Sequence, residues 1–229
     1  PGTGKTTIIR ALVHFMMSNN KKCLLAAPTG RAAKRITETS GHPASTIHRL
    51  LEMTYESGDG GFTFMRNENA LLDEQIIIVD EASMIDCQLM GALLRAIKPG
   101  ARFIMIGDSD QLPSVGAGNV LKDIIDSGVM PVVTLTEIFR QAQQSAIVTN
   151  AHKIVKGEHI DLTKKDKDFF FFQRQTFPEL QRLVVDLCKT RLPKAYGYSP
   201  IQDIQVLSPT RKGPSGIVEL NKILQQELN

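Results

Sequence analysis

Apolar and polar residues along the first 156 positions follow two alternating patterns. Short apolar runs rich in β-branched residues are typical of buried parallel strands, whereas apolar residues spaced three and four apart are typical of helices. The runs predict strands at 22–27, 75–79, 102–107 and 131–135. The spaced pattern predicts helices at 5–19, 30–39, 45–52, 86–97, 117–127 and 144–156. This alternation predicts an α/β fold in which a parallel sheet carries helices on both faces.

Two other regions depart from this alternation. Residues 53–73 have a glycine-rich centre flanked by Thr, Tyr and Phe, which predicts a β-hairpin. The second half of the chain predicts a buried phenylalanine strand at 169–172, a second strand at 204–207, and helices at 177–191 and 217–228. We therefore expect a first domain at 1–135, with an inserted hairpin subdomain at about 53–73, and part of a second domain at 136–229.

The first seven residues, PGTGKTT, match the second half of the phosphate-binding pattern G-x-x-x-x-G-K-[ST]. Glycines let backbone N–H groups turn toward phosphate oxygens, and a helix that starts there adds its positive end. Lys5 would reach the β- and γ-phosphates, and the Thr6 hydroxyl would bind Mg²⁺. The alternative is a glycine-rich helix start with a surface lysine. The predicted nucleotide-binding residues are Gly2, Thr3, Gly4, Lys5, Thr6 and Thr7.

Polar residues follow the predicted strands at 75–79 and 102–107. Asp80 can hold Mg²⁺ opposite the P-loop, and Glu81 can orient the attacking water. Gln111, in the run GDSDQLP, suits a sensor of the γ-phosphate because its amide both donates and accepts. The alternatives are an acidic helix start and an ordinary turn. Together with the P-loop, these residues predict a Mg²⁺-dependent nucleotide hydrolase.

Composition narrows the possible partners. The chain has 27 Lys and Arg against 24 Asp and Glu, for a net charge of +3. This balance excludes a strongly basic arm as the main device for nucleic-acid binding, but not a local basic groove. No apolar run approaches the roughly 18 residues of a membrane span, so we expect no membrane partner. The three cysteines form no CxxC pair, which favours a reducing, cytoplasmic location.

Seven motifs then occur in a fixed order: PGTGKTT, AAPTGRAAK, STIHRL, DEASM, GDSDQLPSVGAG, LTEIFRQ and VLSPTRKG. Together they resemble the superfamily 1B DNA helicases of the RecD/TraA type, a family that includes exodeoxyribonuclease V alpha subunits. The resemblance implies two RecA-like domains, ATP and Mg²⁺ as cofactors, and 5′ to 3′ translocation on single-stranded DNA with duplex unwinding in repair and recombination. The alternatives are another P-loop enzyme, such as a small-molecule kinase, and a non-catalytic DNA-binding module.

The resemblance also assigns residue roles. It makes Lys5, Glu81, Gln111 and Arg140 catalytic, with Arg140 stabilising charge on the transferred phosphoryl group. Without the resemblance, a surface arginine in an ion pair is the better interpretation of Arg140. The implied metal ligands are Thr6 and Asp80. Because the first P-loop glycine and the later family motifs are not in this sequence, we expect the chain to be part of a longer helicase and weak or inactive as an ATPase alone.

The implied DNA contacts come from three of the motifs. They are Pro28, Thr29, Gly30, Arg31, Thr46, His48, Thr210 and Arg211. Thr29 could instead be only a helix cap, and His48 only a half-buried helix residue. The implied partners are single-stranded DNA and a duplex junction, with other subunits of a helicase–nuclease complex left open. In this family a hairpin at the position of residues 53–67 helps to split the duplex; the alternative is a surface hairpin without that role.

Overall fold

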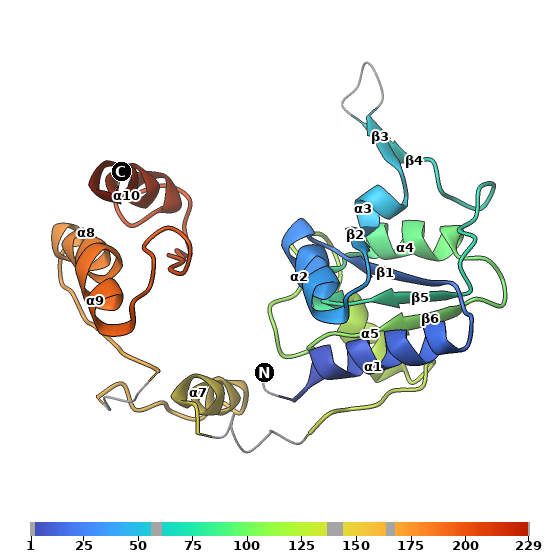
Figure 1. Cartoon of the computed structure of the whole chain (residues 1–229), viewed down its shortest axis with the longest axis horizontal. Coiled ribbons are helices and arrows are strands. Elements are labelled where there is room, and N and C mark those ends of the chain that lie inside the picture. Colours follow the sequence, from blue (N-terminus) through green and yellow to red (C-terminus); the bar gives the residue numbers. More distant parts are fainter. Residues whose placement is uncertain (1–2, 56–60, 137–143, 164–167, 229) are drawn as a thin grey trace. The chain divides into compact units, whose positions relative to one another are not determined.

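The computed structural model describes residues 3–55, 61–136, 144–163 and 168–228. The chain divides into two compact units, residues 1–160 and residues 161–229 (Figure 1). The sequence placed a domain boundary after residue 135, whereas the contacts within the chain separate after residue 160. That the second unit is part of a RecA-like domain stays a prediction.

The first unit is built on a four-stranded sheet whose neighbouring strands are all parallel. Its strand order is β2-β1-β5-β6. The strands are β1 (Cys23–Ala27), β2 (Ala44–Thr46), β5 (Ile76–Val79) and β6 (Arg102–Met105). Three of them confirm predicted strands. β2 was predicted as the start of a helix, and the predicted strand at 131–135 has no strand structure.

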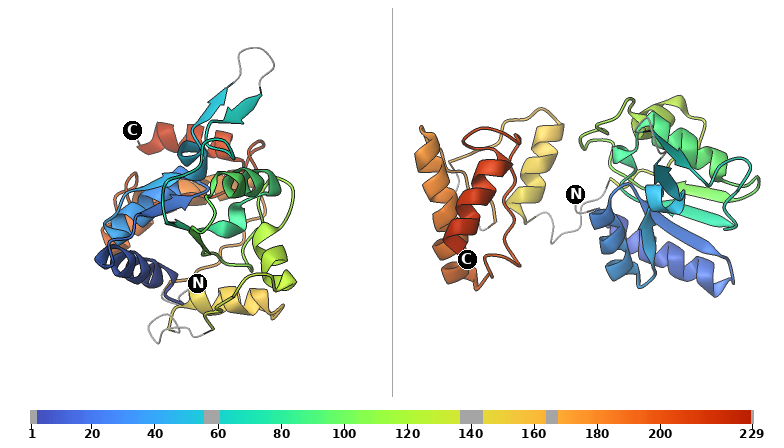
Figure 2. Two further views of the ribbon diagram at one scale, coloured as in Figure 1. Left: turned by 90° about the vertical axis from the view of Figure 1, so that its right-hand side faces the viewer. Right: turned by 90° about the horizontal axis from the view of Figure 1, so that it is seen from above.

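Helices cover both faces of the sheet (Figures 1 and 2). Because side chains alternate across a strand, Ile76 and Ile78 of β5 face one apolar cluster while Ile77 and Val79 face the other. The first cluster includes residues of α1 (Lys5–Ser18) and α2 (Gly30–Ser40). The second includes residues of α3 (Ile47–Leu50), α4 (Cys87–Ala96) and α5 (Val120–Ser127). The predicted α/β fold with helices on both faces is therefore confirmed.

Capping residues set several helix boundaries. The Asp86 carboxylate accepts a hydrogen bond from Leu89 N–H at 2.8 Å and starts α4. The Ser145 hydroxyl accepts one from Val148 N–H at 3.3 Å and starts α7 (Ala146–Val155). Such caps satisfy backbone donors that have no partner within the helix. These starts lie within two residues of the predicted ones.

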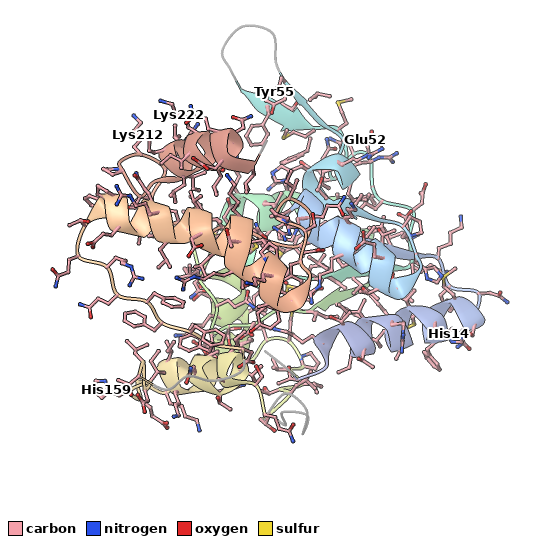
Figure 3. The ribbon with its side chains drawn as sticks, turned by 60° about the vertical axis from the view of Figure 1, so that its left-hand side comes forward. His14, Glu52, Tyr55, His159, Lys212 and Lys222 are labelled. Atoms are coloured by element: carbon pink, nitrogen blue, oxygen red, sulfur yellow. The ribbon has the colours of Figure 1, made fainter. Side chains whose placement is uncertain are left out.

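The predicted hairpin is present. β3 (Met53–Tyr55) and β4 (Phe62–Phe64) pair in antiparallel register, with Thr54 opposite Thr63. The hairpin projects away from the central sheet (Figure 1). Tyr55 lies near its outer end with 76% of its surface exposed (Figure 3). The predicted turn at 57–61 lies almost wholly outside the described residues.

The second unit is helical. It comprises α8 (Phe177–Asp186), a π-helical turn η2 (Leu187–Arg191), α9 (Leu192–Tyr196) and α10 (Ile217–Leu228). Its buried residues are Leu183, Cys188, Gly216 and Leu220. The predicted strands at 169–172 and 204–207 are wrong, and the side chains of Phe170, Phe171 and Phe172 are exposed rather than core. A strand needs a neighbour for its backbone hydrogen bonds, and none occurs among residues 168–228.

In the described part of the chain, no helix combines the length and the apolar character needed to cross a membrane.

Candidate nucleotide-binding site

The site begins where α1 begins. Gly4, the residue before the helix, has φ 83° and ψ 19°, a left-handed conformation that glycine adopts without steric cost. No side chain caps this helix start. The first backbone N–H groups of a helix have no partner inside it, so this uncapped start offers donors that suit a phosphate. Gly2 lies outside the described residues; Thr3 and Thr6 are half-buried, and Thr7 is exposed.

The carboxyl ends of β5 and β6 carry two carboxylates beside this helix start. The Lys5 Nζ atom lies 2.9 Å from Asp108 Oδ2, although 103 positions separate the two residues. Asp80 follows β5, and the charge of Lys5 also acts on it. Ligands of open parallel sheets bind outside the carboxyl ends of the strands. The structure therefore brings together three chain segments, around residues 5, 80 and 108, at that edge.

The Lys5–Asp108 pair is half-buried, with 27% of the Lys5 side chain and 16% of the Asp108 side chain exposed. Burial raises the pKa of Asp108, but the hydrogen bond and charge of Lys5 outweigh this effect. A weaker hydrogen bond from Asp110 N–H, at 3.3 Å, acts in the same direction. The pKa of Asp108 therefore lies below its ordinary value, and the carboxylate is ionised at neutral pH.

Asp80 differs from Asp108 although both lie near Lys5. Loss of hydration on burial raises the pKa of Asp80 above its ordinary value. A hydrogen bond from Glu81 N–H, at 2.9 Å, and the charges of Lys5 and Arg35 offset this only in part. The Asp80 carboxylate is thus a half-buried hard oxygen donor without full compensation of its charge. Together with the Thr6 hydroxyl, it is the kind of oxygen ligand that Mg²⁺ prefers.

Glu81 has an unusual backbone. Its φ of 53° and ψ of 40° are left-handed, a conformation that costs a non-glycine residue about 1–3 kcal/mol. Two hydrogen bonds hold this turn: Glu81 N–H donates to Asp80 Oδ1 at 2.9 Å, and Ala82 N–H donates to the Ile106 carbonyl at 3.0 Å. Strain of this kind is concentrated at functional sites. The local sequence carries no signal for it.

The segment after β6 begins tightly packed and then becomes exposed. A Cβ at Gly107 would lie 2.6 Å from a Leu121 methyl carbon and 3.2 Å from the backbone nitrogens of Ala82 and Ser83. Gln111 follows in an exposed turn that Gln111 N–H closes by donating to the Asp108 carbonyl at 3.2 Å. The Gln111 backbone is therefore tied to Asp108 of the site. The sensor role of the Gln111 side chain stays a prediction.

Four of the predicted DNA-contact residues lie at the start of α2. The Thr29 hydroxyl caps this helix by accepting a hydrogen bond from Ala32 N–H at 3.3 Å. Pro28 is half-buried, whereas Gly30 and Arg31 are exposed. The local capping role of Thr29 is therefore present, and the predicted DNA contacts remain predictions.

The other predicted DNA contacts are divided between the two units. The Thr46 hydroxyl caps α3 by accepting a hydrogen bond from Arg49 N–H at 3.2 Å. His48 is half-buried, with its ring centroid 6.1 Å from that of Phe64 at the base of the hairpin. Thr210 and Arg211 are exposed in the second unit, on the loop before α10 where Figure 3 labels Lys212. Arg140 lies outside the described residues.

Asp108 is a site residue that the sequence reasoning missed. It was only one of several turn-forming residues in GDSDQLP, although a carboxylate shortly after an apolar strand that pairs with the strand preceding Asp80 was an available signal. The buried Ser83 hydroxyl, which has no hydrogen-bond partner among the described residues, was missed as well.

A parallel sheet, a helix that starts in the sequence Gly-Lys-Thr, and carboxylates after two neighbouring strands define a P-loop NTPase domain. A family model described as "AAA domain" matches residues 1–170. The chain belongs to this family.

Known relatives agree with the resemblance seen in the motifs. The chain is 37% identical to the "ATP-dependent RecD2 DNA helicase" of Deinococcus radiodurans, over 100% of this chain and 30% of that protein. It is 30% identical to the "RecBCD enzyme subunit RecD" of Mycobacterium tuberculosis, over 98% of this chain and 44% of that protein. The predicted resemblance to RecD-type helicases is confirmed, and the chain spans less than half the length of these relatives.

Among solved structures, the chain resembles part of a Pif1 helicase from Candida albicans. The two are 22% identical over 70% of this chain and 40% of that chain, with a TM-score of 0.47.

Proposed function

We propose that this chain is the ATP-binding part of a DNA helicase that hydrolyses ATP with Mg²⁺ and moves 5′ to 3′ on single-stranded DNA. The single observation that carries the proposal is the Lys5 ammonium held between the carboxyl ends of β5 and β6, beside an uncapped helix start. The names of the full-length relatives support the helicase activity.

In this proposal the phosphates of ATP lie at the start of α1. Lys5 and the first N–H groups of the helix bind them, and Thr6 and Asp80 hold the metal ion. The ion, when bound, neutralises charge on the β- and γ-phosphates. Asp80 suits this role because an adjacent cation would compensate its half-buried charge.

Hydrolysis requires a positioned water. We assign that task to Glu81, which directly follows Asp80 and has a left-handed backbone in the turn after β5. Gln111 would detect the γ-phosphate, and Arg140 would stabilise charge on the transferred group. Thr3, Gly4 and Thr7 would complete the phosphate loop with Gly2.

DNA would bind along the starts of α2 and α3, with Thr210 and Arg211 as a further contact. α2 starts with exposed Gly30 and Arg31, which leaves N–H groups and a cation available to a DNA phosphate. The hairpin of β3 and β4 would act at a duplex junction, since Tyr55 presents an exposed ring near its outer end. We further propose action in the cytoplasm in DNA repair and recombination, with other subunits of a helicase–nuclease complex as partners.

The test uses the full-length protein on duplexes with a 5′ or a 3′ single-stranded overhang. We expect DNA-stimulated ATP hydrolysis and unwinding of the 5′-overhang substrate only. Lys5→Ala is expected to abolish both activities, and Lys34→Ala, which removes an exposed lysine at a surface ion pair, serves as the control. Nucleotide hydrolysis that is indifferent to DNA, or unwinding only from the 3′ overhang, would refute the corresponding part of the proposal.

A further inference from the structure

The second unit contains an open groove that three arginines line. The groove has a volume of about 560 Å³ and is lined by residues of α8 and of the segment before it. Arg174 comes from that segment, and Arg182 and Arg191 come from the helical run that begins with α8. The carboxylates of Glu179 and Asp186 line the groove as well. Three arginines against two carboxylates leave this groove, here called the arginine groove, with a net charge of +1.

A π-helical turn brings Arg191 to the arginine groove. The run from residue 177 to residue 196 is helical without a break, and η2 is its π-helical part. In an α-helix, residues four apart lie on one face, as Arg182 and Asp186 do here, and position 190 would come next. The wider π turn has one residue more, so Arg191 lines the groove and Thr190 lines a neighbouring hollow instead. Such turns are rare and occur frequently at functional sites.

The arginines keep hydrogen-bond donors available in the groove. Arg191 is held there by its Nε atom, which lies 2.6 Å from Asp186 Oδ2. Arg174 Nη1 donates to the neighbouring Gln173 carbonyl at 2.7 Å. Arg182 is exposed and forms no ion pair with any residue that the structure describes. A guanidinium has several N–H donors, so these contacts leave most of them to a ligand or to water.

A phosphodiester group fits this groove in charge and in geometry. It carries one negative charge, which matches the net charge of the lining, and its two free oxygens match the paired N–H groups of a guanidinium. We propose that the arginine groove binds one backbone phosphate of single-stranded DNA, with Arg174 and Arg182 as the main contacts. This inference rests on the proposed function, in which the full-length protein binds single-stranded DNA.

The predicted DNA contacts of the second unit are attached to the same helix. Thr210 and Arg211 lie on the loop before α10. Gln181, the residue before Arg182, donates from Nε2 to the Pro214 carbonyl of that loop at 2.7 Å. The groove would therefore add a phosphate contact within a unit that already offers a predicted one. Because phosphate contacts carry no base information, the added contact would strengthen binding to every sequence equally.

The experiment measures the affinity of the full-length protein for a fluorescent oligo(dT) and for a mixed-sequence strand at several salt concentrations. Arg182→Gln and Arg174→Gln each remove one cation of the groove. We expect each substitution to weaken binding to both strands by about fivefold at low salt, the worth of one well-placed ion pair. The slope of log affinity against log salt concentration should become shallower by about 0.7, the contribution of one phosphate on a single strand.

Three controls separate phosphate binding from a general effect of charge. Glu179→Gln removes a like charge from the groove and is expected to tighten binding by about twofold. Lys222→Gln removes a cation from an exposed position on α10 outside the groove (Figure 3) and should change affinity by less than about twofold. A strand with neutral methylphosphonate linkages lacks the phosphate charge, so Arg182→Gln and the wild-type protein should bind it equally. Unfolding curves report whether each variant is folded.

The outcomes distinguish this proposal from the proposed function. If the wild-type protein binds single-stranded DNA but both arginine variants keep its affinity and its salt slope, the groove proposal is overturned and the proposed function stands. Equal losses on the methylphosphonate strand, or losses confined to an oligoglutamate peptide tested in place of DNA, overturn the groove proposal as well. If the wild-type protein binds no single-stranded DNA, the proposed function fails, and this inference fails with it.

Discussion

Gly107→Ala tests whether the end of β6 must lie directly against the turn that follows Asp80. The new methyl group would lie 2.6 Å from a Leu121 methyl carbon, and 3.2 Å from the backbone nitrogens of Ala82 and Ser83. Leu121 could rotate away, although it is buried and would lose packing. The backbone nitrogens have less freedom, because Ala82 N–H donates to the Ile106 carbonyl at 3.0 Å.

The cost follows from this crowding. An extra methyl in a well-packed site costs about 1–3 kcal/mol, and we expect a loss of that size in the free energy of unfolding, measured by urea denaturation of the nucleotide-free protein. The shift would also move the turn that carries Glu81, so we expect the hydrolysis rate to fall more than nucleotide affinity. The matched control is Gly91→Ala in the middle of α4, where a Cβ would meet only Arg95 Nη1 at 3.7 Å.

Gly91→Ala should stabilise the protein by about 0.5–1 kcal/mol, because alanine restricts the unfolded chain and favours helix. Hydrolysis should be unchanged in this control. If Gly107→Ala unfolds at the wild-type urea concentration and hydrolyses ATP at the wild-type rate, the close packing of β6 on the Glu81 turn is not required, and the reasoning is refuted.

Substitutions at two further positions and one deletion test the site and its surroundings. Burial raises the pKa of Asp80 above its ordinary value of 3.8. The contribution of Asp80 to folding stability is therefore greatest below pH 3.8 and is lost as the pH rises through the raised pKa. Asp80→Asn should therefore raise the thermal midpoint of the nucleotide-free protein at pH 7 while abolishing Mg²⁺-dependent hydrolysis; a lowered midpoint contradicts this. Thr29→Ala should cost about 1 kcal/mol in urea denaturation through loss of the α2 cap, and Thr29→Ser should restore it. The affinity for single-stranded DNA should be weaker in Thr29→Ala than in the wild-type protein and unchanged in Thr29→Ser. If both variants bind DNA as tightly as the wild-type protein, Thr29 only caps the helix and does not contact DNA. Deleting residues 56–61 should abolish strand separation but leave ATP hydrolysis intact, and unchanged unwinding would exclude a role for the hairpin in splitting the duplex.

The sequence predicted the sheet well where a strand is a continuous apolar run, whether the strand is fully buried, as β5 is, or only partly buried, as β6 is. The apolar runs of β1, β5 and β6 appear directly in the sequence, and the polar residue that follows such a run marks the functional edge of the sheet. β2 escaped detection because its three residues, Ala44–Thr46, are not strongly apolar, and parallel pairing with β1 alone makes them a strand. At residues 169–172 a strand was predicted where the structure has none. Four consecutive phenylalanines have high strand propensity, but a segment without a partner strand does not form a strand.

The sequence indicated individual residues of the candidate site, but it did not indicate which of them contact each other. Lys5, Thr6, Asp80 and Glu81 carry their chemistry in local motifs, so spacing alone suggested them. The Lys5–Asp108 contact joins residues 103 positions apart, and it depends on where β6 lies in the sheet. Similarly, no preference of glutamate explains the left-handed backbone of Glu81: Glu81 N–H donates to Asp80, and the next N–H, of Ala82, donates to Ile106 just after β6.

The opposite pKa shifts of the two carboxylates suggest how the site divides its charges. Lys5 directly compensates Asp108, which stays ionised, and it leaves the charge of Asp80 only partly compensated. Asp80 would therefore gain more than Asp108 from a nearby divalent cation. Under the proposed function, Asp80 would bind the cation and Lys5 would bind the phosphates of one and the same Mg²⁺–nucleotide complex. Binding of the cation and binding of the phosphates would therefore favour each other. We accordingly expect Asp108→Asn to raise the affinity for ADP both with and without Mg²⁺ in a titration of the full-length protein. The carboxylate charge that the substitution removes lies against Lys5 and not at the proposed metal ligands, Thr6 and Asp80.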